Sequence, residues 1–544
     1  MRDAEQTASR LIDQVAAAVV GTSHAIAGPF GSRQLVYADY TASGRSLQFI
    51  EDAMANRVLP YYANTHTETS YTGMQTTRFR EQARAAIRRG VGATEQHAVI
   101  FCGSGATAGV NKLASILGLR SNKYAGSDKP VVFVGPYEHH SNDLIWRESC
   151  VELVRIPLDE TGHLCMGTLA GELLRHRDAP MRIGSFSAAS NVTGVRTDMR
   201  ALAQLLHEHD ALFFADYAAA APYVAITMSA SAPGANDHID AIFCSPHKFV
   251  GGPGASGVLV ADRKLLASAV PSVPGGGTVA YVNARMHRYV SDAERREEAG
   301  TPAILGDIRA GMVMQLKADI GAERIEALEA ANVAAVLEAW ADEPNIEILG
   351  PSSTDRLAIF SFNIRSGGRY LHPNFVVALL NDLFGIQARG GCSCAGPYAH
   401  DLLGINDEKA ARYDALIQQG LSAYRPGWVR LNFNFFLDAQ TVEFILAAVR
   451  FIARRGAEML AYYGCDAVSG RWRVEGTAIE PAFGFADLCD WSSSDAAVAA
   501  DYPGFATALA EAERLADAAT PCRANGDAVT SNPDRWFALA GDAA

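Results

Sequence analysis

The chain has 544 residues, more than one hydrophobic core usually spans, so we expect two or three domains. Hydrophobic residues make up 49% of the chain and charged residues 20%, which excludes an intrinsically disordered protein. The formal net charge of −13 provides no basic surface, so we expect neither nucleic acid nor an anionic membrane as a partner.

The N-terminal residues and the cysteines indicate a cytoplasmic protein. Leu11, Val15 and Val19 recur at helical spacing, without the basic start, apolar core and cleavage site of a secretion signal. No apolar stretch reaches membrane length. The nine cysteines are scattered and odd in number, which does not suit a secreted disulfide framework. Cys392 and Cys394 lack a second pair of ligands, so no bound metal is expected.

Short apolar runs in the first 300 residues are predicted to be strands. Some of them are separated by segments with helical spacing, at 106–117 and 200–209. Apolar strands that alternate with helices predict a mostly parallel sheet covered on both faces, with ligands at the carboxyl ends of the strands. The predicted strands are 99–103, 131–135, 182–189, 211–217, 241–246 and 256–262.

From about residue 310 the pattern changes to that of a smaller α+β domain. One long helix is predicted over 311–343, followed by strands and helices at 357–364, 374–384, 428–436 and 439–455. The predicted divisions are an N-terminal helical segment (1–35) packing with the small domain, a large domain (36–305), a small domain (306–460) and a C-terminal extension (461–544).

The C-terminal extension carries more aromatic side chains than a disordered tail usually has. They are Trp472, Phe483, Phe485, Trp491 and Trp536. Two interpretations are open for this segment, a packed appendage or an element that docks an acceptor protein.

Polar residues follow the first three predicted strands of the large domain. The glycine-rich turn GSGATAG opens a helix after the first strand. The free N–H groups of a helix N-terminus suit phosphate. The alternative is that these glycines only allow a tight turn before the helix. His139 and His140 follow the second strand, where an aromatic ring suits a flat cofactor. Asn191 follows the third strand.

Charged residues follow the next two strands. Asp216 ends an apolar run, and a buried carboxylate there needs a cation, either in a structural ion pair or on the pyridinium ring of a cofactor. Ser245, His247 and Lys248 follow the fifth strand. Lys248 is either a solvated surface lysine or a desolvated amine that forms a Schiff base.

In this order and wording, the residues resemble the class V aminotransferases, pyridoxal-phosphate (PLP) enzymes of the aspartate-aminotransferase fold, and especially the cysteine desulfurases. The resemblance covers roughly residues 36–455. It implies the α/β fold of the PLP-dependent transferases of fold type I. That fold has a large domain with a mostly parallel seven-stranded sheet, and a smaller α+β C-terminal domain.

The resemblance also implies a role for each polar residue. Lys248 would form the Schiff base and later move protons, Asp216 would pair with the pyridine nitrogen, and His139 would stack on the ring. Asn191 would lie near the phenolic oxygen. Residues that would hold the phosphate are Ala106, Thr107, Ser245 and His247, joined by Thr301 in EEAGTPA, which would reach the phosphate of the partner subunit. A homodimer with shared active sites is therefore expected.

One position departs from the family pattern. The family usually has a glutamine three residues after the aspartate, where it touches the phenolic oxygen of the cofactor. Here that position is Ala219, so this donor is missing. The electronic tuning of the cofactor therefore stays open.

The segment QARGGCSCAGPYAHDLLG (387–404) bears on which PLP reaction takes place. It resembles the cysteine loop of the cysteine desulfurases and is also similar to that of the molybdenum cofactor sulfurases. By this likeness Cys394 would take sulfur from L-cysteine as a persulfide, and Cys392 would be a relay thiol or inert. The alternative is that both are small loop residues, because free cysteine often packs as a hydrophobe.

Two arginines are expected to bind the substrate. Arg430, in WVRLNFNF, matches the family's arginine for the substrate carboxylate, and a guanidinium fork suits a carboxylate. Arg389 would help to orient the cysteine loop.

The expected function is a PLP-dependent cysteine desulfurase that converts L-cysteine to L-alanine and transfers the sulfur to an enzyme cysteine as a persulfide, with a sulfur-acceptor protein as a candidate partner. The alternative within enzymes is a class V aminotransferase, lyase or epimerase that acts on another amino acid without Cys394. A scaffold that keeps PLP for stability is a third hypothesis. The presence of Lys248, Asp216 and His139 argues against it.

Overall fold

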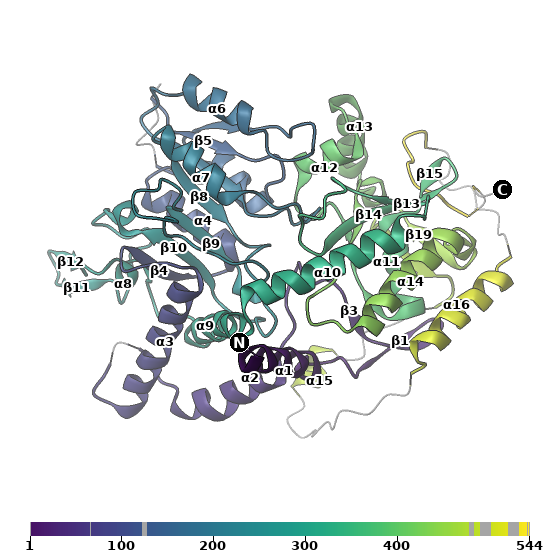
Figure 1. The fold of residues 1–544 in the computed structure, drawn as a ribbon, viewed down its shortest axis with the longest axis horizontal. Helices are drawn as coiled ribbons and strands as arrows, with labels where there is room; N and C mark the ends of the chain where they lie inside the picture. Colours follow the sequence, from purple (N-terminus) through teal and green to yellow (C-terminus); the bar gives the residue numbers. More distant parts are fainter. Residues whose placement is uncertain are drawn as a thin grey trace. The chain divides into compact units, whose positions relative to one another are not determined.

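The computed structural model describes residues 2–65, 67–121, 128–477, 484–489, 502–520, 532–540 and 542. Its contacts divide the chain into two compact units, whose elements are labelled in Figure 1. The first unit comprises Met1–Val20, Tyr40–Ala331 and Ser353–Ala358. The second comprises Gly21–Asp39, Asn332–Ser352 and Ile359–Ala544.

The centre of the first unit is a seven-stranded sheet with the order β4-β10-β9-β8-β7-β5-β6. Neighbours from β9 to β6 pair in parallel, and β10 is antiparallel to both β4 and β9. This confirms the expected α/β sheet. The strands are β4 (His97–Cys102), β5 (Val131–Val134), β6 (Glu152–Arg155), β7 (Arg182–Ser187), β8 (Leu212–Asp216), β9 (Ala241–Cys244) and β10 (Gly257–Asp262).

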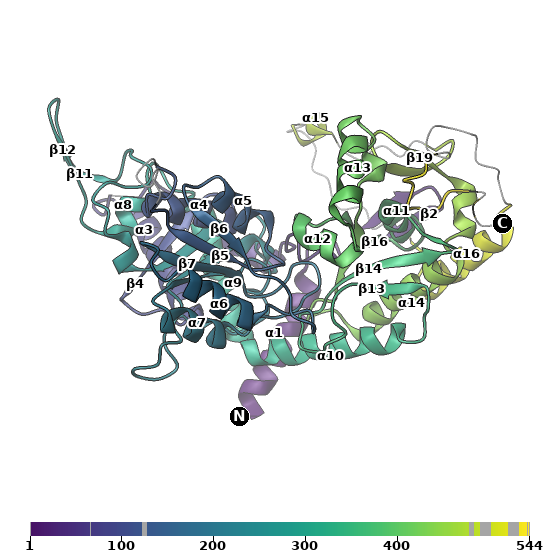
Figure 2. The same cartoon turned by 90° about the horizontal axis from the view of Figure 1, so that it is seen from above.

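Helices cover both faces of this sheet, as its buried apolar strands require. Figure 2 shows α6 (Met166–Arg175) and α7 (Met199–Glu208) on one face, and α4 (Gly105–Ile116) and α5 (Leu144–Arg147) on the other. Both faces of the sheet are therefore buried against helices, so polar groups are expected at the ends of the strands.

The prediction of one continuous helix over 311–343 is wrong. The structure has α9 (Ile304–Ile320) and α10 (Ala322–Trp340), which are separated at Gly321. Gly321 has φ +92°, a left-handed conformation that glycine adopts readily and L-residues rarely do. Helix α9 packs along α3 (Tyr71–Gly90), and α1 (Arg2–Ala18) contacts α9, so both α1 and α9 belong to the first unit.

An antiparallel sheet with the order β13-β14-β18-β17 forms the framework of the second unit, with β15 (Arg369–Tyr370) paired to β14. Helices α11 (Pro373–Phe384) and α14 (Ala439–Arg455) contact this sheet. The arrangement is the expected α+β architecture. Its other strands are β13 (Ile346–Ile348), β14 (Ile359–Ser366), β17 (Arg389–Gly391) and β18 (Trp428–Asn432).

Much of the described C-terminal extension packs within the second unit, whereas Phe485 in the short helix α15 (Phe485–Leu488) is exposed. The extension contains a hairpin of β19 (Tyr463–Asp466) and β20 (Arg471–Val474), and helix α16 (Phe505–Ala518), which contacts α11 and α14. Trp536 stacks at 5.5 Å on the buried His372, beside Trp472. Two other aromatic residues of the extension, Phe483 and Trp491, and also Cys522, lie outside the described residues.

Among the described helices, none combines the length and the apolar character needed to cross a membrane.

Candidate functional site

The loops that follow five strands of the large sheet lie at the same edge of that sheet. Strands β4, β5, β7, β8 and β9 all point in the same direction, because β10 alone is reversed. Their carboxyl ends therefore share the edge where ligands collect in such sheets. The predicted residues on these loops and strand ends are Ala106, Thr107, His139, Asn191, Asp216, Ser245, His247 and Lys248.

The glycine-rich turn at the start of α4 meets the loop after β9. Ala106 donates its backbone N–H to the Oγ of Ser245 at 2.9 Å. Gly105 has φ +57°, and a Cβ placed on it would lie 2.7 Å from Ser245 Oγ and 2.9 Å from His247 Cε1. Burial, together with the charge of Lys248, lowers the pKa of His247 to about 4. The structure thus brings together the helix N-terminus, a hydroxyl and a neutral imidazole.

His139 is connected to the same turn through one serine. The Nδ1 of His139 accepts the backbone N–H of Ser141 at 3.1 Å, and Ser141 Oγ lies 3.0 Å from that nitrogen. The hydroxyl of Ser141 is also 2.6 Å from Thr107 Oγ1. Ser141 was not singled out from the sequence, although it belongs to the motif PYEHHSN that placed His139. It fixes the imidazole relative to the turn at Thr107.

Asp216 ends β8 as a buried carboxylate. Its Oδ1 accepts the backbone N–H of Ala218 at 2.8 Å. Burial raises the pKa of Asp216, while the charge of Lys248 acts in the opposite direction. Lys248 ends a short 3-10 turn, where its own N–H donates to the carbonyl oxygen of Ser245 at 3.0 Å. The two residues are therefore close enough for their charges to interact.

A second buried carboxyl, Glu138, was missed by sequence reasoning although it stands next to His139. Its side chain accepts the N–H of Ser187 at 3.0 Å, the hydroxyl of Ser187 at 2.6 Å and the amide of Asn142 at 2.7 Å. Ser187 is the β7 residue paired with Asp216. Burial raises the pKa of Glu138 to about 7, and the negative charge of Asp216 adds to that rise.

Two further predicted residues lie in different surroundings. Asn191 is buried in the loop after β7, next to Ser190, whose Oγ accepts backbone N–H groups from Val192 and Thr193 at 3.1 Å each. Thr301 is exposed, and its Oγ1 accepts a hydrogen bond from Asn64 at 3.4 Å. Within the described part of the chain, no hydrogen bond joins Thr301 to the turn at Ala106.

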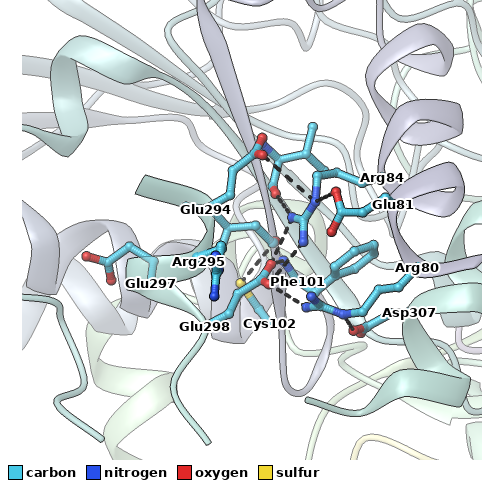
Figure 3. Close-up of polar contacts among 12 residues, drawn as sticks. Arg80, Glu81, Arg84, Phe101, Cys102, Glu294, Arg295, Glu297, Glu298 and Asp307 are labelled. Carbon is cyan, nitrogen blue, oxygen red and sulfur yellow. Dashed lines mark hydrogen bonds and ion pairs between the residues drawn. The ribbon is translucent and has the colours of Figure 1, made fainter. Parts of the chain in front are cut away.

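The segment that contains Thr301 is held in place by a buried cluster of ion pairs (Figure 3). The cluster is centred on Glu298, three residues before Thr301. Glu298 accepts hydrogen bonds from Arg80, from Arg84 at 3.0 and 3.1 Å and from the N–H of Phe101 at 2.8 Å. Asp307 accepts a second bond from Arg80 at 2.7 Å. Burial opposes ionisation of Glu298, but the two arginines outweigh it and lower its pKa. The carboxylates thus bind the Thr301 segment to α3 and β4.

In the second unit, the two predicted substrate-binding arginines share one carboxylate. Arg430 of β18 is buried and donates from Nη2 to Asp39 Oδ1 at 3.1 Å. Arg389, on the facing position of β17, donates from Nε to Asp39 Oδ2 at 3.0 Å. Asp39 was not predicted, because it lies 391 residues before Arg430 in the sequence. Two guanidiniums against one carboxylate leave a net positive charge, which suits an anionic group.

The cysteine loop presents Cys394 outward from a constrained backbone. Ser393 and Cys394 have φ values of +53° and +57°, which side-chain-bearing residues rarely adopt and which cluster at functional sites. Ser393 Oγ accepts the indole N–H of Trp428 at 3.2 Å, and the buried Ala395 donates its N–H to Cys392 O at 3.1 Å. Cys394 is exposed and Cys392 is half-buried.

The residues of the first unit fit PLP, the cofactor that the resemblance implies. The N-terminus of α4, with Ser245 Oγ at 2.9 Å from Ala106 N, has the donors and dipole that a phosphate requires. The buried Asp216, with its raised pKa, suits a cationic ring nitrogen as its partner. Lys248 acts electrostatically on that same carboxylate. An anion site, a carboxylate and an amine are therefore arranged on one sheet edge.

Comparisons with known proteins agree with this arrangement. The family model for aminotransferase class-V matches residues 36–436. A probable cysteine desulfurase from Halobacterium salinarum is 29% identical over 381 residues, which cover 69% of this chain and 86% of the relative. A cysteine desulfurase from Klebsiella pneumoniae is 28% identical over 367 residues, or 67% of this chain and 85% of the relative.

Solved structures are similar as well. The apo structure of a cysteine desulfurase from Thermococcus onnurineus has a TM-score of 0.64 and 25% identity, and the match covers 77% of this chain and 95% of that one. A cysteine desulfurase from Escherichia coli has a TM-score of 0.59 at 22% identity, over 76% of this chain and 93% of its own, which is a likeness of fold.

Proposed function

Because the chain belongs to the class V aminotransferase family of PLP-dependent enzymes, we propose that it is a cysteine desulfurase. The observation that carries this proposal is the exposed Cys394, on a left-handed turn just after Arg389, which faces Arg430 across strands β17 and β18. A nucleophilic thiol needs access to its substrate, and a carboxylate-binding arginine suits an amino acid. We further propose a cytoplasmic homodimer in which Thr301 reaches the phosphate of the partner subunit.

The large-domain residues bind and tune the cofactor. When bound, PLP would supply an electrophilic carbonyl carbon and an electron sink. The N-terminus of α4, with Ser245 and the neutral His247, holds its phosphate. Asp216, which is buried, would place a negative charge at the ring nitrogen, and His139, fixed by Ser141, would lie against the ring. Lys248 would provide the amine that anchors the cofactor and would move protons to and from the substrate carbon.

The small-domain residues bind the substrate and take its sulfur. Arg430 binds the carboxylate of L-cysteine, with Asp39 fixing its guanidinium. The thiolate of Cys394 forms a bond to the substrate sulfur as the carbon–sulfur bond breaks, and the carbon takes up a proton. L-Alanine leaves, and Cys394 keeps the sulfur as a persulfide, which is then passed to the thiol of an acceptor protein.

Product analysis of the holoenzyme with L-cysteine and excess dithiol tests the proposal. We expect alanine and sulfide in equal amounts from the wild type and from the matched control Cys392→Ser. Lys248→Ala should lose the visible absorbance of the cofactor Schiff base and both products. Cys394→Ser should keep the absorbance and lose both products. Alanine formation that survives Cys394→Ser would instead assign a lyase reaction without a cysteine nucleophile.

A further inference from the structure

Three side chains of metal-ligating type meet at the edge of the large sheet opposite the cofactor residues. His207 lies in the last turn of α7, and Asp240 immediately precedes β9, with His238 two residues before it. Lys248 follows the other end of β9. The cluster of His207, His238 and Asp240 is therefore separate from the proposed active site and plays no part in its chemistry.

The spacing of their donor atoms suits a single ion. His207 Nε2 lies 3.0 Å from Asp240 Oδ2, and His238 Nε2 lies 3.6 Å from Asp240 Oδ1. All the ligand atoms lie within 4.8 Å of one another. Tetrahedral zinc with bonds of about 2.0–2.1 Å places its ligands about 3.3 Å apart. The two separations, each to a different oxygen of the Asp240 carboxylate, lie on either side of that value.

The hydrogen bonds of His207 direct one of its nitrogens toward this point. His207 Nδ1 is 2.9 Å from the carbonyl oxygen of Asn236, which can only accept, so Nδ1 carries a hydrogen. In neutral His207 the Nε2 lone pair then faces Asp240, where either a proton or a metal ion joins the two groups. A histidine that binds a metal usually donates its other N–H to such a carbonyl.

Two protonated histidines are disfavoured in this cluster, because their rings lie against each other. The imidazole rings of His207 and His238 are stacked at 4.0 Å, with an angle of 18° between their planes, so two protonated rings would repel each other. The carboxylate of Asp240 is fixed by the N–H of Phe213 at 2.8 Å.

The surroundings of the cluster suit a cation with an open position. The negative end of the α7 dipole lies at His207, and Asp237 adds a further negative charge near that ring. Asp262, together with this cluster, acts electrostatically on the nearby His97. The His238 side chain is 38% exposed, so its ring is able to rotate toward an ion and water can complete the coordination.

We propose that His207, His238 and Asp240 bind one Zn²⁺ ion, which ties the loop before β9 to the end of α7. Two imidazoles and a carboxylate are the donors that zinc takes in proteins, with water as the fourth ligand. Since an ion that binds only the folded chain stabilises it by mass action, zinc should also raise the melting temperature.

Zinc titration of the full-length holoenzyme, dialysed first against EDTA, tests this site. A chromophoric chelator measures how many zinc ions the protein binds and how tightly. Zinc bound by cysteines is common to all the variants, so the difference between variants reports the proposed site alone. The wild type and the control His287→Ala, an exposed histidine elsewhere, should bind one more equivalent than His238→Ala and His238→Asn. Zinc should raise the melting temperature of the first two proteins only.

Cobalt gives a second readout that does not depend on stability. Substitution with Co²⁺ should give the strong visible absorption of a four-coordinate site in the wild type, reduced at least about tenfold in both His238 variants. Equal zinc stoichiometry and equal cobalt spectra in the wild type and the His238 variants would overturn the proposal. So would a wild type that binds no zinc in competition with the chelator.

Discussion

Arg430 donates from Nη2 to Asp39 Oδ1 at 3.1 Å, so the arginine proposed to bind the substrate carboxylate already holds a carboxylate of its own chain. Burial lowers the pKa of Arg430, and the negative charge of Asp39 counteracts that effect. Arg389 shares Asp39 from the facing strand. The second guanidinium leaves one positive charge in excess, which the substrate carboxylate would neutralise.

Asp39→Asn should be strongly destabilising, because it leaves the buried Arg430 without its anion. Removing one partner of a buried ion pair costs about 3 kcal/mol of unfolding free energy or more. Arg389→Ala removes the partner whose side chain is 52% exposed and should cost less than about 1 kcal/mol. Urea denaturation of both variants measures the difference. Equal losses in the two proteins would contradict this account of the pair.

Gly105→Ala should weaken PLP binding. A Cβ at this position would lie 2.7 Å from Ser245 Oγ, on a residue with φ +57°, so the turn that faces the phosphate must shift. We expect at least about a tenfold loss of affinity, the free energy of roughly one charge-assisted hydrogen bond. Gly171→Ala is the control, since Gly171 also lies in a helix and its Cβ would meet nothing within 4 Å. Spectroscopic titration with PLP that finds equal affinity for both variants would contradict the phosphate assignment.

The sheet and most of the cofactor residues were predictable because buried parallel strands are continuous apolar runs and the ligand lies at their carboxyl ends. Strand β6 was not found, since Glu152 and Arg155 end a short, partly exposed run at the sheet edge. The break at Gly321 was missed because helical periodicity continues on both sides of it. Asp39 carries no local motif, and its role depends on contacts with strands that follow hundreds of residues later.

Glu298→Gln should destabilise the large domain. It removes the charge that balances Arg80 and Arg84, whose side chains are 6% and 2% exposed. The expected loss is about 3 kcal/mol or more of unfolding free energy. Glu81→Gln is the matched control, because Glu81 also pairs with Arg84 but is 54% exposed, and it should cost less than about 1 kcal/mol. Chemical denaturation compares the two, and a Glu298 variant as stable as the Glu81 variant would show that the cluster in Figure 3 does not hold this segment.

Glu138 should make stability depend on pH. Burial raises its pKa from 4.5 to about 7, so the folded chain favours the protonated acid. The contribution of Glu138 to the unfolding free energy is fully present below about pH 4.5, where the unfolded chain also holds the proton. It is lost as the pH rises through about 7. This loss is on the order of 3 kcal/mol. The unfolding free energy of Glu138→Gln should therefore fall less between pH 5 and pH 8 than that of the wild type or of the exposed-site control Glu160→Gln. Parallel pH profiles of unfolding free energy for all three proteins would contradict the raised pKa of Glu138.

The central claim is that Cys394 takes the substrate sulfur, and peptide mass spectrometry tests it most directly. The holoenzyme is given L-cysteine without a reductant, alkylated and digested, with Lys248→Ala treated in parallel. We predict one additional sulfur atom on the peptide at Cys394 in the wild type, matched by the alanine released, and none in Lys248→Ala. Alanine that accumulates while Cys394 stays unmodified would contradict the account.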